Sequence, residues 1–387
     1  MTVDATSIDR LLAAALRGDG AAWPIGWSGS EQAGRTIERI GYHGIAGLIA
    51  EQASRLVDWP GAVLAWVREQ AIALAMWELR HKEIVADLLA ALAEERVAAL
   101  LLKGSALAYD LYSAPATRAR GDSDVLIAAA DLDPARAILA RRGFRCQPRD
   151  EAIADDLALQ EVWSILCPAG TKHHVDLHWQ LINAPALHGI LDFERCARQT
   201  MPLPRLGHGA RTMRHPLTLL HTCIHRAMHL TSPYFVDGVT YYGGDRLIWA
   251  KDIELLSRSM TEAEWCEFTA IALDQGVAAV CLDGLQLAER TLGATIADGV
   301  FRQLGTAVAE PASAYLIGSG QARRAWLDLR AIPGLRRKLA YVAARSVPTG
   351  RFMRDKYPGL SDRPLAVLHL QRLADLIRPR PRDGKRR

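Results

Sequence analysis

Residues 118–127 read R-A-R-G-D-S-D-V-L-I. The last six of these residues, 122–127, predict a β-strand with apolar residues after two carboxylates. On a strand, side chains two positions apart share a face, so Asp122 and Asp124 point the same way and Ser123 points the opposite way. Carboxylates about 6–7 Å apart on one face repel each other unless a cation lies between them. The stretch therefore predicts a cation site.

A second predicted strand carries a third carboxylate. Residues 161–167 and 172–179 are separated by the turn-forming sequence P-A-G-T, which predicts a β-hairpin. Along its second strand, one face is apolar and the other carries His174, Asp176, His178 and Gln180. An aspartate in the middle of a half-buried strand is costly without a partner, so Asp176 is a third candidate ligand. Oxygen ligands of this kind suit Mg²⁺ or Mn²⁺.

Lys103-Gly104-Ser105 lies where a short apolar run, 97–102, is predicted to pass from a strand into a helix. Backbone N–H groups at such a helix start can hold a phosphate, and the serine hydroxyl and lysine ammonium add donors. The motif is not a Walker A loop, because the G-x-x-x-x-G-K-[ST] spacing is missing. Taken alone, these three residues do not identify a nucleotide site.

The order of these parts resembles the polymerase-β-type nucleotidyltransferase superfamily. More closely, L-L-K-G-S-A (101–106), residues 118–127 and H-V-D-L-H-W (174–179) resemble an uncharacterised bacterial nucleotidyltransferase family. Residues 219–225 and 245–256 are similar to the C-terminal helical part of that family, and the resemblance runs from about residue 60 to 377. It implies transfer of a nucleoside monophosphate from an NTP to a small-molecule, peptide or protein acceptor, with Mg²⁺ or Mn²⁺.

The resemblance also implies roles for individual residues. Asp122, Asp124 and Asp176 would be the catalytic residues and the metal ligands, and Asp176 would also activate the acceptor hydroxyl. The nucleotide-binding residues would be Lys103, Gly104, Ser105 and Arg118.

Two positions close to the first two aspartates leave questions open. Arg118 matches a recurrent arginine of the family, and it either reaches a phosphate or pairs with a carboxylate. Ser123 stands where the family more often has an apolar residue. Because Ser123 faces away from the metal, we expect this departure to do little harm.

The pattern along the chain predicts an α/β (α+β) fold with a small mixed-sheet nucleotidyltransferase core. N-terminal helices and a C-terminal helical bundle flank this core. The predicted divisions are a helical segment (1–95), the core (96–200), a helical domain (201–377) and a basic tail (378–387). Helices are predicted over 61–96, 133–142, 216–230, 245–258, 261–274, 276–291, 320–346 and 363–377, with one more strand over 144–147. Asp133 is the predicted N-cap of the second of these helices, with Pro134 at its first position.

Three histidines, His221, His225 and His229, share one face of a predicted helix. Their spacing can bind zinc, but Thr222 stands where a metalloprotease motif requires glutamate, and a hydrogen-bonding role is favoured. The resemblance favours His225 as a cleft residue near Asp252. On the next helix, Arg246, Trp249 and Asp252 share a side. They either shape a pocket for the base or acceptor, or supply a buried Arg–Asp pair that locks two helices.

Composition excludes some classes of protein. Of the 387 residues, 50% are hydrophobic and 23% charged, which excludes a disordered chain. No signal peptide is apparent, the apolar runs are too short to cross a bilayer, and six cysteines without C-x-x-C spacing predict reduced core thiols. These observations predict a cytoplasmic protein without a membrane partner.

The net charge of +4 is unevenly distributed. Residues 321–387 contain 18 Lys/Arg against 5 Asp/Glu, whereas residues 1–320 carry −9. This basic region either contacts phosphates or an acidic partner, or is a solvated face, and the solvated face is favoured. Three alternatives to the main function remain: a nucleic-acid-directed nucleotidyltransferase, a non-catalytic nucleotide-binding or partner protein, and a phosphotransferase.

Overall fold

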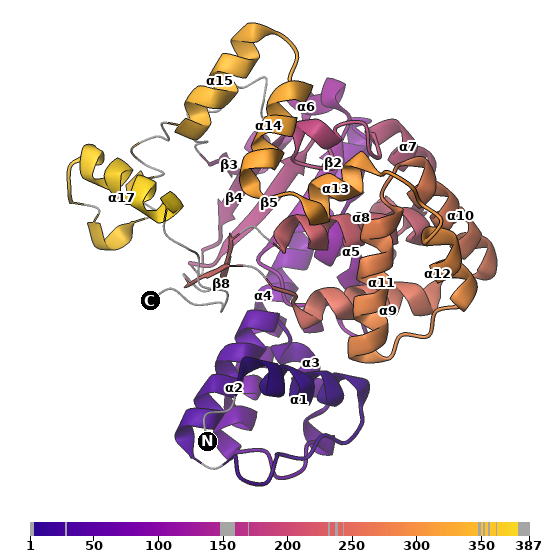
Figure 1. Cartoon of the computed structure of the whole chain (residues 1–387), viewed down its shortest axis with the longest axis vertical. Helices are drawn as coiled ribbons and strands as arrows, with labels where there is room; N and C mark the ends of the chain where they lie inside the picture. The colour runs from indigo at the N-terminus through magenta and orange to yellow at the C-terminus, as the bar shows by residue number, and fades with distance from the viewer. Residues whose placement is uncertain are drawn as a thin grey trace.

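The computed structural model describes residues 4–27, 29–147, 159–168, 170–230, 233–236, 239–242, 244–346, 350, 353–354, 357–360 and 362–377. Within these residues a five-stranded mixed sheet is flanked by helices, which confirms the predicted α+β class (Figure 1). The predicted basic tail, 378–387, lies outside the described residues. The division of the chain into domains stays a prediction.

The sheet has the strand order β1-β2-β5-β4-β3, in which β2 and β5 run parallel and the other neighbours are antiparallel. The strands are β1 (Ala99–Leu101), β2 (Asp122–Ile127), β3 (Arg145–Cys146), β4 (Gln160–Leu166) and β5 (Lys172–His178). The predicted strands and the predicted hairpin, β4–β5, are confirmed. Apolar side chains cover both faces: Val125 and Val175 pack in one buried cluster, while Leu126 packs in the other.

The N-terminal helices are α1 (Ala5–Arg17), α2 (Ser30–His43), α3 (Ala46–Glu51), the 3₁₀ turn η1 (Ala53–Arg55) and α4 (Gly61–Glu94). Helix α4 runs for 34 residues because no glycine or proline interrupts it after its first position. It leads from the group α1–α3 to the sheet (Figure 1). Its second half packs Val85, Leu88 and Leu92 into the cluster that contains Val125 and Val175. Helix α4 therefore covers the sheet face that carries the odd-numbered residues of β2 and β5.

Three further helices are α5 (Lys103–Asp110), α6 (Leu132–Arg141) and α7 (Phe193–Arg198), with the 3₁₀ turns η2 (Pro115–Thr117), η3 (Ala129–Asp131) and η5 (Pro185–Leu187). The predicted N-cap was wrong: α6 begins at Leu132, and the Asp133 side chain accepts a hydrogen bond from Arg136 at 2.9 Å. Two small hairpins follow in the chain, β6 (Thr200–Pro202) with β7 (Arg211–Met213) and β8 (Pro233–Val236) with β9 (Val239–Tyr242). Neither of these two hairpins was predicted from the sequence.

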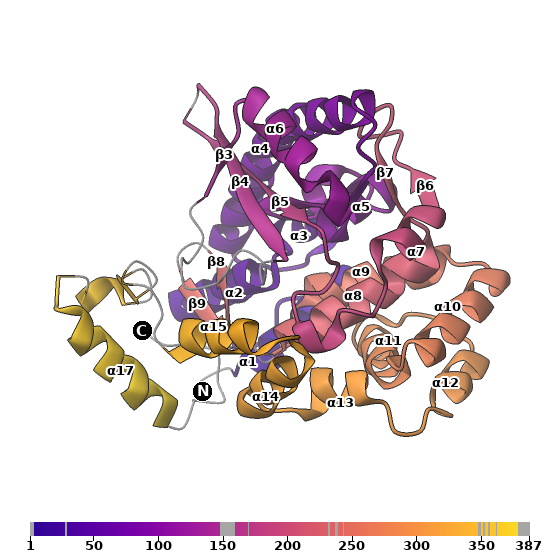
Figure 2. The ribbon, with the colours of Figure 1, turned by 90° about the horizontal axis from the view of Figure 1, so that it is seen from above.

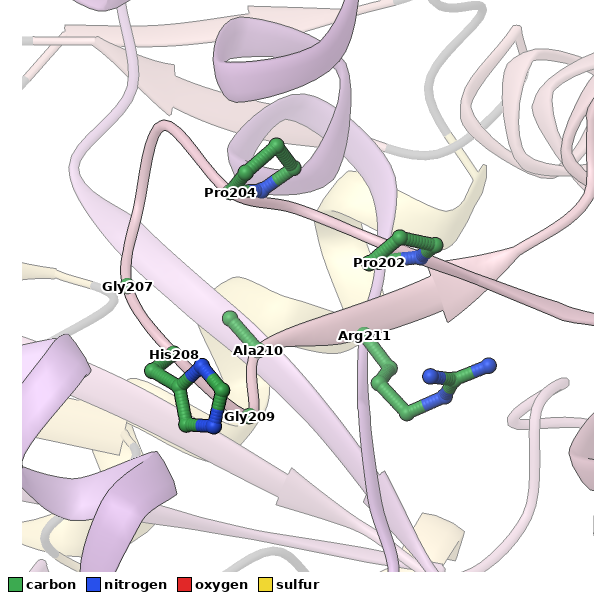
Figure 3. A pocket seen from close by; sticks show the side chains of 7 residues that line it. All are labelled: Pro202, Pro204, Gly207, His208, Gly209, Ala210 and Arg211. Atoms are coloured by element: carbon green, nitrogen blue, oxygen red, sulfur yellow. The ribbon is translucent and has the colours of Figure 1, made fainter.

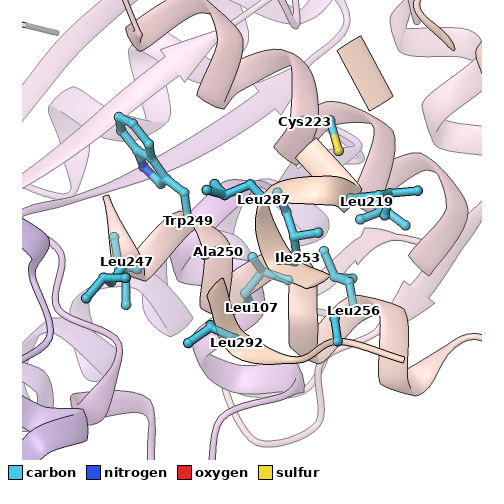
Figure 4. Packing of buried hydrophobic residues seen from close by; sticks show 14 of the residues in the cluster. Leu107, Leu219, Cys223, Leu247, Trp249, Ala250, Ile253, Leu256, Leu287 and Leu292 are labelled. Carbon is cyan, nitrogen blue, oxygen red and sulfur yellow. The ribbon is translucent and has the colours of Figure 1, made fainter. Parts of the chain in front are cut away.

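The C-terminal helices form a bundle beside the other sheet face. They are α8 (His215–His229), α9 (Leu247–Ser259), α10 (Glu262–Asp274), α11 (Ala278–Leu292), α12 (Asp298–Leu304), α13 (Pro311–Gly318), α14 (Gln321–Ala331), α15 (Leu335–Ser346), the 3₁₀ turn η6 (Pro358–Leu360) and α17 (Leu365–Ile377). Leu219 of α8, Ile253 of α9 and Leu287 of α11 meet in one buried cluster, to which α5 adds Leu107 (Figure 4). The bundle therefore lies over the face of the sheet that carries Leu126.

One predicted helix of the basic region was wrong. The expected helix 320–346 is two helices, α14 and α15, which break at Pro333 and Gly334. Proline has no N–H for the helical hydrogen bond, and Gly334 adopts a φ of 77°, which favours glycine. Both helices remain attached to the body, because the buried Asp328 of α14 accepts hydrogen bonds from Tyr315 and Tyr341.

The N-terminal helices are also fixed to the bundle (Figure 2). His43 of α2 contacts Asp9 of α1 at 2.8 Å through Nε2, and its Nδ1 accepts from the backbone N–H of Leu247, where α9 begins. Arg246 donates to the carbonyl oxygen of Tyr42 at 2.7 Å. These contacts hold the start of α9 against the N-terminal helices. Helix α9 carries Asp252, which binds Arg118 in the loop before β2.

Candidate active site

The register of the two parallel strands brings the predicted carboxylates together. Asp124 of β2 is paired with Asp176 of β5, and Asp122 is paired with His174. Alternation along a strand puts Asp122, Asp124, Asp176 and His178 on one face. The three carboxylates predicted from separate segments therefore share one side of the sheet, which is the side toward the C-terminal bundle.

Asp124, Asp176 and His178 form a compact group. One ligand-type atom from each lies within 4.8 Å of the other two, and this is the one such group of three found among the described residues. The Nε2 of His178 lies 2.9 Å from Oδ1 of Asp124. Sequence reasoning did not include His178 in the metal site, although its position two residues after Asp176 already placed it on the same face.

A lysine provides positive charge to this group. The Lys103 ammonium donates to Oδ1 of Asp124 at 2.6 Å, next to the His178 contact. Lys103 is the first residue of α5 and has a φ of 51°, an uncommon conformation for a side-chain-bearing residue. The backbone N–H of Leu102 donates to the carbonyl oxygen of Asp124 at 2.9 Å. The start of α5 is thus fastened to β2 by both backbone and side chain.

The carboxylates differ in their proton affinity. Burial, reinforced by the charges of Asp122 and Asp124, raises the pKa of Asp176 to about 7. Loss of hydration and the charge of Asp124 raise the pKa of Asp122 to about 6, although part of its side chain is exposed at the edge of the group. Burial acts to raise the pKa of Asp124 as well, but Lys103 and His178 outweigh it and hold that pKa below its usual range.

These pKa shifts show that the Lys103 ammonium alone does not neutralise the three carboxylates. Three carboxylates lie together, and the pKa values of two of them are raised by burial and mutual repulsion. Carboxylate oxygens with this excess of negative charge fit a divalent cation such as Mg²⁺ or Mn²⁺. Asp122, Asp124 and Asp176 are the residues that would hold it, with His178 in contact with Asp124.

Gly104 and Ser105 lie at the N-terminal turn of α5, directly after Lys103. A Cβ added to Gly104 would lie 3.0 Å from the guanidinium carbon of Arg118, so a side chain here would displace that arginine. The Ser105 hydroxyl is buried and donates to the carbonyl oxygen of Asp122 at 3.0 Å. The hydroxyl is therefore occupied within the protein, while the start of α5 retains its free backbone N–H groups.

Of the two interpretations of Arg118, the structure favours the ion pair with a carboxylate. Arg118 donates to both oxygens of Asp252 on α9, at 2.9 and 2.7 Å, and Tyr112 donates to the same carboxylate at 2.7 Å. Asp252 thus belongs to a buried Arg–Asp pair, but its partner is Arg118. Arg246 instead contacts the backbone of Tyr42.

The histidine row of α8 lies beside the bundle helix α9. His225 and His229 have ring centroids 4.5 Å apart, and Trp249 lies 6.2 and 6.1 Å from them. Burial and then the Lys103 charge lower the pKa of His221 to about 3 and that of His229 to about 4, so both are neutral near pH 7. The three rings are not part of the compact ligand group described above.

A cavity of about 480 Å³ lies elsewhere, in the loop that joins β6 and β7 (Figure 3). Its lining includes Pro202, His208 and Arg211, and it contains none of the predicted site residues. Arg211 is held by Thr200 at 2.9 Å. We assign this cavity no role in the site.

The pattern of carboxylates on β2 and β5, with Lys103-Gly104-Ser105 at the start of α5, agrees with a comparison against protein families. The family model described as uncharacterised nucleotidyltransferase matches residues 30–293. The chain belongs to this nucleotidyltransferase family. It is accordingly a transferase of phosphorus-containing groups. A comparison with curated proteins finds none that matches the chain.

The match covers the sheet, α4 and the bundle as far as α11, so all the site residues named above lie within it. The structure also bears on the predictions about membrane-spanning segments and about the cysteines. None of the described helices is long and apolar enough to cross a membrane. Four of the six cysteines are buried, but Cys146 and Cys266 are exposed, so the prediction of core thiols was wrong for these two.

Proposed function

We propose that this nucleotidyltransferase moves a nucleoside monophosphate from an NTP to a hydroxyl group of a small-molecule, peptide or protein acceptor, with Mg²⁺ or Mn²⁺. The observation that carries the proposal is the pairing of Asp124 with Asp176 on parallel strands, with Asp122 on the same face. The strand–helix turn at Lys103-Gly104-Ser105, followed by the Asp-x-Asp strand, supports assignment to the polymerase-β-type superfamily. Family membership supports the same reaction class.

Each residue has a defined part in this proposal. Asp122, Asp124 and Asp176 hold the divalent cation, which when bound neutralises charge on the phosphate oxygens. The Asp176 carboxylate, on the same face as the cation site, also accepts the proton of the acceptor hydroxyl. The acceptor oxygen then bonds to the α-phosphorus while the bond to the bridging oxygen breaks, and pyrophosphate leaves.

The phosphates are bound at the start of α5. Backbone N–H groups of Gly104 and Ser105 and the ammonium of Lys103 supply positive potential there. Because Arg118 is bound to both oxygens of Asp252, we assign it the task of holding the bundle against this turn.

The test uses each NTP labelled either at the α- or at the γ-phosphate, with Mg²⁺ or Mn²⁺ present. Mass spectrometry then follows the protein and candidate acceptors. We expect the α-label with its nucleoside to appear on an acceptor in the wild type and in Asp133→Asn, which changes an 89% exposed carboxylate outside the site. Asp176→Asn should transfer about 10³-fold more slowly.

The alternatives give different results in the same experiment. Transfer of the γ-label alone would replace the proposal with a phosphotransferase. Saturable NTP binding without any turnover would indicate a non-catalytic nucleotide-binding protein. Transfer that requires added RNA or DNA and weakens steeply with salt would indicate a nucleic-acid-directed enzyme that uses the basic region.

A further inference from the structure

A row of hydrogen bonds connects α4 to the active-site strand from the opposite face of the sheet. His81 of α4 lies 2.8 Å from the Ser123 hydroxyl through its Nε2. The Ser123 hydroxyl lies 2.9 Å from that of Ser105, which donates to the carbonyl oxygen of Asp122 at 3.0 Å. Behind His81, its Nδ1 lies 3.2 Å from Nδ1 of His173 on β5. The row therefore ends on the backbone of a predicted metal ligand.

The direction of every bond in this row follows from its last member. A carbonyl oxygen only accepts, so the single hydroxyl proton of Ser105 is on the bond to Asp122. The Ser105 oxygen must then accept from Ser123, and the Ser123 oxygen must accept from the Nε2–H of His81. A neutral His81 has an unprotonated Nδ1, which accepts from the Nδ1–H of His173. All donors thus point toward Asp122.

The surroundings keep this arrangement in place. His81, His173, Ser105 and Ser123 are each at most 2% exposed. The ring of Trp77 stacks on His81 at 4.0 Å, and the two imidazoles stack on each other at 5.3 Å. Burial and the nearby Arg120 charge hold the pKa of His81 at about 2, so the ring is neutral. Rotation of either serine hydroxyl would leave a buried polar group without its partner, which is costly.

We propose that His81 and Ser123 are positioning residues that fix the start of α5 relative to the carboxylates of β2. Ser105 follows directly on Lys103 and Gly104, and its bond to Asp122 sets the distance between the phosphate-binding turn and the metal-binding strand. Ser123 fixes the rotation of the Ser105 hydroxyl, and His81 fixes that of Ser123. This inference rests on the proposed function. It also explains why a serine stands at position 123, where the family more often has an apolar residue.

Kinetics of NTP-dependent transfer test the inference. Ser123→Ala removes both bonds of the central hydroxyl with little change in volume, and we expect kcat to fall about 10- to 100-fold with little change in KM for the NTP, because displacement of about 1 Å in a catalytic site costs about that much. Ser123→Thr keeps the hydroxyl and should retain most of the activity. His81→Gln offers an amide N–H near the position of Nε2 and should exceed His81→Leu in kcat.

A matched control separates positioning from general destabilisation. Thr269→Val removes a buried hydroxyl of α10 that donates to Gln303 at 2.9 Å, far along the chain from the site. We expect it to lower the melting temperature without changing kcat. If Ser123→Ala keeps the wild-type kcat, or if its kcat falls only as far as that of Thr269→Val, the inference is wrong.

Two measurements without NTP distinguish this inference from the proposed function. Mn²⁺ binding, followed by electron paramagnetic resonance, should weaken about 10-fold in Ser123→Ala, as is typical when groups that orient metal ligands are removed. In ¹⁵N-histidine spectra of the wild type, His81 should carry its proton on Nε2 and His173 on Nδ1. An inactive wild type would overturn the proposed function alone; a His81 proton on Nδ1, or unchanged Mn²⁺ affinity in Ser123→Ala, would overturn the inference.

Discussion

Arg118, four residues before Asp122, donates hydrogen bonds to both carboxylate oxygens of Asp252, at 2.9 and 2.7 Å. Arg118 and Asp252 are 134 positions apart in the chain. The same guanidinium packs against Gly104, where an added Cβ would lie 3.0 Å away. One arginine therefore contacts the start of α5, the loop before β2 and the bundle helix α9. This ion pair therefore joins the bundle to the loop before β2.

Removal of one partner should be strongly destabilising. Asp252→Asn leaves a buried guanidinium without its counter-charge, a change that costs about 3–5 kcal/mol in the free energy of unfolding. The exposed pair Arg195–Asp274 provides the control, because Asp274→Asn should cost less than about 1 kcal/mol. Urea unfolding measures both. Equal effects in the two variants would contradict a structural role for the buried pair.

The three site aspartates should be essential for transfer. Asp122→Asn, Asp124→Asn and Asp176→Asn each keep the shape of the side chain and remove one negative charge from the cation site. Loss of one strong electrostatic contact commonly lowers the rate about 10²- to 10³-fold, and loss of a metal ligand should lie at the upper end. Steady-state transfer of labelled nucleotide measures the effect. Near-wild-type rates in all three variants would remove the basis of the proposed nucleotidyl transfer.

The substitution Asp176→Asn should lower activity but should not lower the stability of the metal-free protein. The pKa of Asp176 is raised to about 7, so above that pH its charge is buried and repelled by Asp122 and Asp124. A raised pKa in the folded state means that this carboxylate stabilises the fold when protonated and destabilises it as the pH rises through about 7. In EDTA at pH 8, Asp176→Asn should therefore melt at or above the wild-type temperature. Added Mg²⁺ and NTP should stabilise the wild type more than the variant. A markedly lower melting temperature in EDTA would argue against this repulsion.

A second pH effect lies outside the metal site. Nε2 of His215, at the start of α8, lies 2.8 Å from Asp110 of α5, and this hydrogen bond raises the pKa of His215. Glu264 of α10 adds to the increase, while burial and Arg214 oppose it. Stability from this pair is fully present below the unfolded pKa of about 6.5 and is lost as pH rises through the folded value.

The substitution His215→Gln should therefore cost more stability at pH 6 than at pH 8.5. Chemical unfolding of the wild type and variant at both pH values measures the difference. A cost that does not change with pH would show that the imidazole is not protonated in the pair.

Much of this site was predictable because its main elements have local patterns. Asp122–Ile127 ends in a short continuous apolar run, which is typical of a buried strand, and the β4–β5 hairpin has its turn residues in sequence. The strand period of two placed Asp176 and His178 on one face. The pairing of β2 with β5 was not predictable from local patterns. The parallel register that pairs Asp124 with Asp176 depends on how the whole sheet assembles.

The contacts that hold the site together were less accessible to sequence reasoning. His81 and Glu78 are buried residues of α4, yet their partners come from other elements: Ser123 for His81, and Arg120 and Tyr109 for Glu78. Nothing in a local pattern selects those partners. The helix break at Pro333-Gly334, by contrast, had a visible signal in the sequence that the prediction of a single helix overlooked.

His178 provides the sharpest remaining test of the metal site. Its imidazole, 1% exposed, contacts Asp124 through Nε2 at 2.9 Å, and burial lowers its pKa so that the ring is neutral. In this geometry the ring donates to Asp124 and orients the carboxylate. His178→Ala should therefore weaken Mn²⁺ binding about 10- to 100-fold, whereas His178→Gln, which retains an N–H donor, should keep most of the affinity. Mn²⁺ titration of both variants, with melting temperatures as a check on folding, separates the two roles. If His178→Gln binds as weakly as His178→Ala, the imidazole is itself a ligand, and Asp124, Asp176 and His178 together hold the cation.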